Sequence, residues 1–177
     1  MEDVWYGGCV NYGEVFVGSS IARDTLVGLV DEIVCFVEGT KVLTEYGLIS
    51  IENIKTGMNV YTKNEITGRI ELKPVLQTHK NYVDLDMCKV YVNGEIIEST
   101  AGHEYYEVSK GWIAARQLRP GDVVLNSNNE EMIVEKVELN LFNGRELTTV
   151  YNLTIKDNHN YFVGENSILV HNGPEPC

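Results

Sequence analysis

The length and composition of the chain are typical of one globular domain with short flanks. It has 177 residues, of which 44% are apolar, and this is enough to build a core. The net charge of −12, from 26 acidic and 14 basic residues, argues against nucleic acid or an anionic membrane as a partner, because both bind clustered Lys and Arg. The opening Met1-Glu2-Asp3 is not that of a signal peptide, and every apolar run is too short to span a bilayer.

The cysteines predict neither a metal site nor a disulfide framework. All four (Cys9, Cys35, Cys88 and Cys177) lack CxxC or Cys/His ligand spacing. We therefore expect a monomeric chain without a metal or cofactor. Cys88 is expected in the core, and His79 at the surface.

The elements in chain order predict an all-β fold after one helix. Residues 19–32 form an amphipathic run that is typical of a helix, with Ser20 as a candidate cap. Turn signals then recur at the short spacing that is typical of all-β proteins. Residues 91–97 predict a hairpin around Asn93-Gly94, a pair that suits a tight primed turn. Residues 148–155 alternate over the length of one strand.

An internal repeat predicts two similar halves. Residues 47–60 match residues 111–124 at a constant offset of 64 positions. The matched positions carry glycine or an apolar side chain: Gly47 and Gly111, Ile49 and Ile113, Ile54 and Leu118, Gly57 and Gly121, Val60 and Val124. Two copies are too few for a solenoid, so we expect one pseudo-symmetric β domain.

Cys35, Thr100 and His103 are candidates for a reaction on the backbone. Cys35 closes an apolar run, and its thiolate could attack the Val34 carbonyl to form a thioester. The leaving amide nitrogen needs a proton, which a histidine of near-neutral pKa such as His103 can donate. The Thr100 hydroxyl can hold the peptide or its oxyanion. Taken singly, the cysteine could be a core residue, and the Thr100–His103 segment a polar loop with a surface histidine.

Asn172 is the candidate for a second reaction, at the far end of the chain. Its side-chain nitrogen can attack its own carbonyl, form a succinimide and free Gly173. His171 and His159 could polarise that carbonyl or activate the amide. The alternative is a turn at Asn172-Gly173, but residues 173–176 (Gly-Pro-Glu-Pro) cannot supply a returning strand.

These segments resemble a known family in order and in type. Residues 35–42 (CFVEGTKV) resemble the opening of a Hint domain, the fold shared by hedgehog C-terminal domains and inteins. Residues 100–103 are similar to the internal TxxH motif of that family, and residues 150–172 to its two closing motifs. The resemblance implies a pseudo-two-fold horseshoe over residues 35–172. Residues 1–34 would then be an upstream flank, and residues 173–177 a downstream stub.

The implied activity is a single-turnover reaction of the chain on itself. Its flanking segments are the substrate, and small thiols or amines could intercept the thioester. The resemblance assigns catalytic roles to six residues: Cys35, Thr100, His103, His159, His171 and Asn172. Splicing inteins normally carry Cys, Ser or Thr where this chain has Gly173, so the chain resembles bacterial intein-like domains and toxin-releasing Hint domains more closely. Cleavage at both junctions should dominate, with low-level splicing.

Two alternative functions are considered, and the chain departs from the intein motifs at one further position. One alternative is an inert β-rich spacer or binding module that keeps the fold. Another is a hedgehog-like transfer of the acyl group to a small nucleophile. The departure is Asn152, which stands where many inteins have Asp, so it cannot supply a charge to the first thiol.

Overall fold

The computed structural model describes residues 33–144 and 146–172, and within these ranges the fold is built from β-strands and two 3-10 turns. The predicted helix at 19–32 lies outside the described residues. The strands are β1 (Phe36–Val37), β2 (Lys41–Thr44), β3 (Gly47–Ser50), β4 (Asn59–Lys63), β5 (Ile70–Val83), β6 (Met87–Val92), β7 (Glu95–Thr100), β8 (Glu104–Glu107), β9 (Gly111–Ala114), β10 (Val123–Leu125), β11 (Glu131–Asn140), β12 (Thr148–Ile155), β13 (Asn160–Val163) and β14 (Ile168–His171), and the 3-10 turns are η1 (Ile51–Asn53) and η2 (Ala115–Gln117). In the described part of the chain, no helix has the length and apolar character needed to cross a membrane.

Two local predictions are confirmed. β6 and β7 pair antiparallel around Asn93-Gly94, where both residues have positive φ, 49° and 76°, as a primed two-residue turn requires. The alternating run at 148–155 forms β12 with the expected bounds. Local sequence patterns therefore predict the positions of these elements in the chain.

The internal repeat is confirmed as two similar halves. In each copy a strand that starts at a glycine of positive φ (β3, β9) leads into a 3-10 turn (η1, η2). A second glycine follows, Gly57 or Gly121, with φ of 91° and 93°. Each of these two glycines donates its N–H to a later strand, to the Val75 carbonyl at 2.9 Å and the Val134 carbonyl at 2.8 Å. The two glycines, which lie 64 positions apart, thus make equivalent hydrogen bonds in the two halves, and this explains why glycine recurs there in the sequence.

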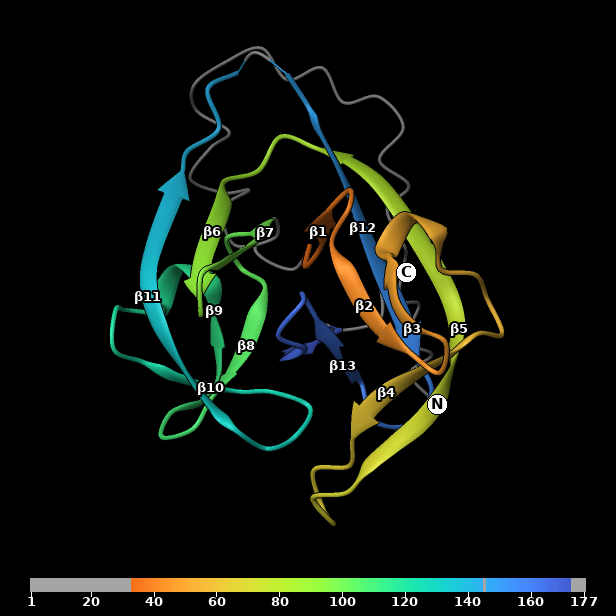
Figure 1. Cartoon of the computed structure of the whole chain (residues 1–177). Helices are drawn as coiled ribbons and strands as arrows, with labels where there is room; N and C mark the ends of the chain where they lie inside the picture. The colour runs from red at the N-terminus through yellow and green to blue at the C-terminus, as the bar shows by residue number, and fades with distance from the viewer. Residues whose placement is uncertain (1–32, 145, 173–177) are drawn as a thin grey trace, which may run out of the picture.

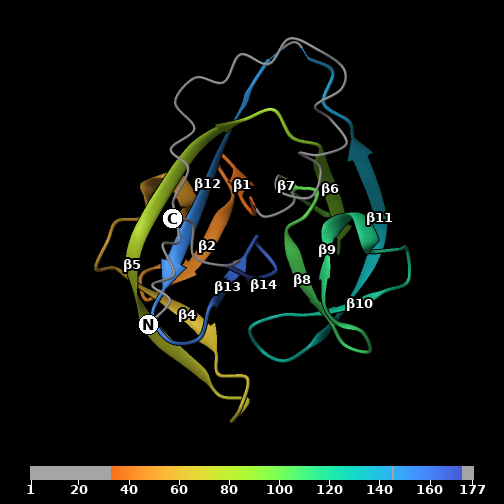
Figure 2. The ribbon, with the colours of Figure 1, turned by 180° about the vertical axis from the view of Figure 1, so that it is seen from behind.

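The halves exchange strands, and this exchange builds the centre of the molecule. β6 follows the first half in the chain but pairs with β7 and β11 of the second half. β12 follows the second half but pairs with β1 and β5 of the first. Figure 1 shows β5 and β12 on one side, β6 and β11 on the other, and β13 between them; Figure 2 shows the same arrangement from behind. β1 meets β7 at Phe36 and Ser99, beside the pseudo-two-fold axis.

The core occupies both halves, and it confirms the prediction for Cys88 but not that for His79. Cys88 is fully buried in the main apolar cluster, as expected. Cys35 belongs to a small separate cluster that contains Val83 and Val150. His79 is half-buried rather than at the surface, because its Nε2 lies 2.8 Å from the Thr154 hydroxyl on the neighbouring strand.

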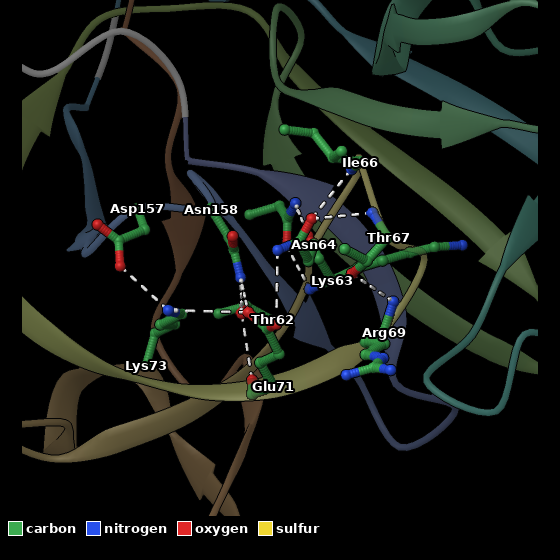
Figure 3. A network of polar contacts seen from close by, with 11 residues as sticks. Thr62, Lys63, Asn64, Ile66, Thr67, Arg69, Glu71, Lys73, Asp157 and Asn158 are labelled. Carbon is green, nitrogen blue, oxygen red and sulfur yellow. Dashed lines mark hydrogen bonds and ion pairs between the residues drawn. The ribbon is translucent and has the colours of Figure 1, made fainter.

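A polar network fixes the loop that precedes β13. The Asn158 amide donates to the Thr62 hydroxyl at 2.7 Å and to Glu71 at 3.2 Å, and Lys73 pairs with Asp157 at 3.0 Å (Figure 3). The loop is thereby tied to the hairpin of β4 and β5. It carries His159, whose main chain takes part in the site described next.

Candidate functional site

The upstream junction is held by the side chain and main chain of Thr100, the last residue of β7. The Cys35 N–H donates to the Thr100 hydroxyl oxygen at 3.1 Å, and that hydroxyl donates to the Ile33 carbonyl at 2.9 Å. The Thr100 N–H donates to the Cys35 carbonyl at 2.9 Å. One threonine therefore bonds to the chain on both sides of the Val34–Cys35 peptide. Cys35 and Thr100 are 2% and 1% exposed, so water does not compete with these bonds.

The Cys35 thiol is protonated at rest. Burial raises the pKa of this thiol to about 12, and the side chain of Asn81 on β5 opposes the rise by hydrogen bonding. The thiolate is the nucleophilic form, and a raised pKa makes this form rare at neutral pH. A thiol in this state needs a base before it can attack a carbonyl.

His103 lies beside this junction as an uncharged ring. Its ring centroid is 4.0 Å from that of Phe36, the residue after Cys35. The His103 N–H donates to the Thr100 carbonyl at 3.0 Å, and the Ala115 N–H of η2 donates to the His103 carbonyl at 2.7 Å, so its backbone is fixed on both sides. Neither ring nitrogen makes a hydrogen bond of good geometry within the residues that the structure describes. Burial lowers the pKa of His103 to about 3, against a smaller opposing effect of the His171 backbone.

The expectation that His103 has a near-neutral pKa is therefore wrong. Full burial without a charged partner stabilises the neutral imidazole. At neutral pH the ring can accept a proton first and donate it afterwards, but it cannot start as the imidazolium.

This depressed pKa predicts a loss of stability in acid. The unfolded chain binds a proton near the usual histidine pKa of 6.5, whereas the folded chain binds it only near pH 3. The free energy of unfolding should therefore fall as the pH drops through this window, and its full value should return above it. His103→Leu should reduce the loss, as measured by urea unfolding at pH 7 and pH 4.5 in an Asn172→Ala background. Equal losses in both chains would contradict the shift.

The downstream junction is held by Asn152 and by the main chain of His159. Asn172 is 2% exposed and directly follows β14. Its N–H donates to the His159 carbonyl at 2.9 Å, and its carbonyl accepts a hydrogen bond from Asn152 Nδ2 at 2.8 Å. The carbonyl that cyclisation would attack is thus already in contact with a buried donor.

The two histidines of the closing motifs occupy different surroundings. The His171 ring is half-buried, with a T-shaped contact to Trp112 at 5.0 Å and Nδ1 3.7 Å from Glu104. Burial lowers the pKa of His171, and the carboxylates of Glu104 and Glu65 oppose this. The His159 side chain is exposed, and its backbone has a φ of 52°.

Tyr161 connects the two junctions. Its hydroxyl donates to Asn152 Oδ1 at 3.0 Å, and its pKa is raised by burial and also by the negative charge that Cys35 carries when ionised. Sequence reasoning missed this tyrosine and Asn81. The central strand β13 pairs with both β2 and β14, and this pairing brings Tyr161 between the ends of the domain.

Within residues 33–144 and 146–172, His, Cys, Asp and Glu do not gather into a set that could hold a metal ion. Cys35 and Cys88 are both free thiols.

This fold is that of the Hint domains and inteins, a class built for autocatalytic processing of the chain that contains it. The chain belongs to the pretoxin Hint domain family, whose pattern it matches over residues 41–173. None of the curated proteins matches it.

Several solved structures share the fold. A bacterial intein-like domain from Clostridium thermocellum is 36% identical, with a TM-score of 0.73 over 78% of this chain and 98% of that one. A DnaX mini intein from Spirulina platensis is 24% identical, with a TM-score of 0.66 over 78% of this chain and 99% of that one. A DnaB intein from Synechocystis sp. PCC 6803 is 16% identical, with a TM-score of 0.64 over 80% of this chain and 100% of that one. The two inteins support the fold alone.

Proposed function

We propose that this chain cuts its own backbone at two points, Val34–Cys35 and Asn172–Gly173. The observation that carries the proposal is the Thr100 hydroxyl, which bonds to the main chain on both sides of the first peptide while the buried Cys35 thiol lies beside it. The C. thermocellum relative, an intein-like domain at 36% identity, supports the same class of reaction. The flanking segments of the chain are the substrate.

At the upstream junction the reaction is an N–S acyl shift. Cys35 Sγ attacks the Val34 carbonyl carbon, the bond to the Cys35 nitrogen breaks, and a thioester replaces the amide. Neutral His103 relays the thiol proton to the nitrogen as that nitrogen leaves, because a ring with a pKa of about 3 does not hold the proton of a thiol with a pKa of about 12, and the nitrogen becomes a free amine. The fixed Thr100 contacts align the peptide, and such alignment can supply an effective molarity of about 10⁵ M or more.

At the downstream junction the reaction is cyclisation of Asn172. Its side-chain nitrogen attacks its own main-chain carbonyl, the bond to Gly173 breaks, and the proton leaves with the new amine. The product is a succinimide. Gly173 has no nucleophilic side chain, so the thioester cannot pass to that position. The two cleavages therefore dominate, and ligation follows only when the freed Gly173 amine attacks the Val34 thioester.

The proposal is tested by adding dithiothreitol to the purified chain. A free thiol intercepts a thioester, so residues 1–34 should be released as a thiol adduct at a rate that rises with the dithiothreitol concentration. Cys88→Ala removes the other buried thiol in the described part of the chain and should leave this release intact. An upstream junction that stays whole at every thiol concentration would favour the alternative, a β-rich spacer that keeps the Hint fold without activity.

Gly173→Cys should change the outcome from cleavage toward splicing. The new side chain restores an acceptor for the acyl group, so the ligated fraction of the flanks should rise over the cleaved fraction. Mass spectrometry of the products measures both, with Gly173→Ala as the matched control that adds a Cβ without a thiol. If Gly173→Cys and Gly173→Ala give the same ligated fraction, alignment of the two junctions limits splicing instead of the missing acceptor.

A further inference from the structure

A buried hydrogen bond joins the Asn152 side chain to the Asn172 carbonyl. Asn152 lies in β12 and is 3% exposed. Its Nδ2 is 2.8 Å from the Asn172 carbonyl oxygen, across 20 positions of sequence. Because β12 is the strand exchanged into the first half, this contact brings a side chain of the first half to the last residue of the domain.

The orientation of the Asn152 amide is fixed by two further hydrogen bonds. Its Oδ1 accepts from the Tyr161 hydroxyl at 3.0 Å and from the Leu153 N–H at 2.8 Å. Both partners are donors, so they specify which end of the amide is oxygen and leave the NH₂ group for the Asn172 carbonyl. The pKa of Tyr161 is raised well above its usual value, so this hydroxyl keeps its proton and continues to donate.

The contacts of the two neighbouring histidines differ from that of Asn152. The His171 ring lies against Trp112 and near Glu104, and the His159 side chain is exposed. His159 contacts Asn172 through its main-chain carbonyl, which accepts a hydrogen bond and cannot donate one. The main chain of Asn172 therefore has an acceptor, the His159 carbonyl, for its N–H and a donor, the Asn152 amide, for its carbonyl.

We propose that Asn152 is a catalytic residue for the downstream cleavage and stabilises the oxyanion that forms on the Asn172 carbonyl. This inference rests on the proposed cyclisation. When Asn172 Nδ2 attacks the carbonyl carbon, the carbonyl oxygen gains negative charge, and the Asn152 N–H is already in place to bond to it. The oxygen returns to a carbonyl as the bond to the Gly173 nitrogen breaks. Tyr161 is a positioning residue, because it holds the Asn152 amide without touching the reacting atoms.

The geometry also gives a reason for an amide at a position where many inteins carry Asp. An ionised carboxylate 2.8 Å from the Asn172 oxygen would repel the developing charge, whereas a neutral amide attracts it. The amide at this position therefore suits the downstream reaction of this chain.

Cleavage kinetics test the inference in a Cys35→Ala background, where the downstream step is isolated. Asn152→Ala and Asn152→Asp should each slow cleavage after Asn172 by about 10²- to 10³-fold, the usual effect of removing one oxyanion donor. Tyr161→Phe keeps the ring and should slow it by less than about tenfold, the effect of one neutral hydrogen bond. Asn160→Asp is the matched control, because Asn160 is a buried asparagine whose amide bonds to the main chain of Lys63. It should cleave within a few-fold of the parent chain.

A second readout does not depend on cleavage. In an uncleaved Asn172→Ala chain labelled with ¹³C-carbonyl alanine and ¹⁵N-glycine, the carbonyl at position 172 gives its own signal, and Ala101–Gly102 gives an internal reference. Adding Asn152→Ala should move the signal of position 172 upfield, as expected when a carbonyl loses a hydrogen bond, and should leave the reference in place.

Each outcome decides the question. An unmoved carbonyl signal, or an unchanged cleavage rate in a folded Asn152→Ala chain, would overturn the inference while the proposed function stands. Absence of cleavage after Asn172 in the parent chain would overturn the proposed function itself. A thermal unfolding transition that matches the parent chain shows that a slow variant is folded.

Discussion

Cys35→Ala should abolish thiol-dependent release of residues 1–34 and leave cleavage after Asn172 largely intact. Asn172→Ala should do the reverse. The reason is that the two junctions are held by separate hydrogen bonds, through Thr100 at one and through Asn152 at the other. Gly173 has no side chain that can accept the acyl group, so no branched intermediate links the two reactions, and each can proceed when the other is blocked.

The two variants serve as controls for each other. Both are followed by mass spectrometry of the same time course, with and without dithiothreitol, so that each chain reports on one junction. Thiol-dependent release that persists in Cys35→Ala would show that another group forms the thioester. Loss of downstream cleavage in a folded Cys35→Ala chain would show that the junctions are coupled as in a splicing intein.

His103→Ala should slow the upstream release by a factor of about 10² or more, which is the usual contribution of a general acid or base. The buried thiol has a pKa of about 12, so it depends on a base, and His103 is the uncharged imidazole that lies beside Phe36. Removal of the ring leaves the thiol protonated and the amide a poor leaving group. Initial rates at a fixed dithiothreitol concentration in the Asn172→Ala background measure the effect.

The matched control is His79→Ala, which removes a half-buried histidine that contacts Thr154 instead of the junction. It should release residues 1–34 within a few-fold of the parent rate. Imidazole added to the His103→Ala chain should restore part of the rate if the lost function is proton transfer. A His103→Ala chain that reacts as fast as the His79→Ala chain would remove His103 from the mechanism.

The fold was predictable where the sequence carries local or repeated signals. Asn93-Gly94 fixes a hairpin through the positive φ of both residues, and the glycines at 57 and 121 mark equivalent turns of the two halves. The exchange of β6 and β12 was not predictable, because it depends on pairing between distant strands. β5 shows the same limit: its 14 residues pair with β4 over one part and with β12 over the other.

The residue types of the candidate site could be predicted from the sequence, but their pKa values and protonation states could not. Order and spacing pointed to Cys35, Thr100 and Asn172, all of which are buried. The protonation state of His103 could not be read, since a pKa of about 3 arises from burial that only the assembled fold creates.

Asn152 was noticed only as a departure from the Asp of inteins. Its contact with the Asn172 carbonyl depends on the exchanged strand, and no pattern in the sequence shows that exchange. The sequence offered one indication of this role, namely that Asn152 is a polar residue within the alternating strand at 148–155.

The intact mass of the purified chain after incubation tests the central claim most directly. Self-processing predicts a fragment that ends at Asn172 and is lighter by one water than the hydrolysed acid, because a succinimide closes the chain. It also predicts a second fragment that begins at Gly173. With dithiothreitol the first fragment should begin at Cys35. A chain that keeps its full mass with and without thiol, while remaining folded, would contradict the account.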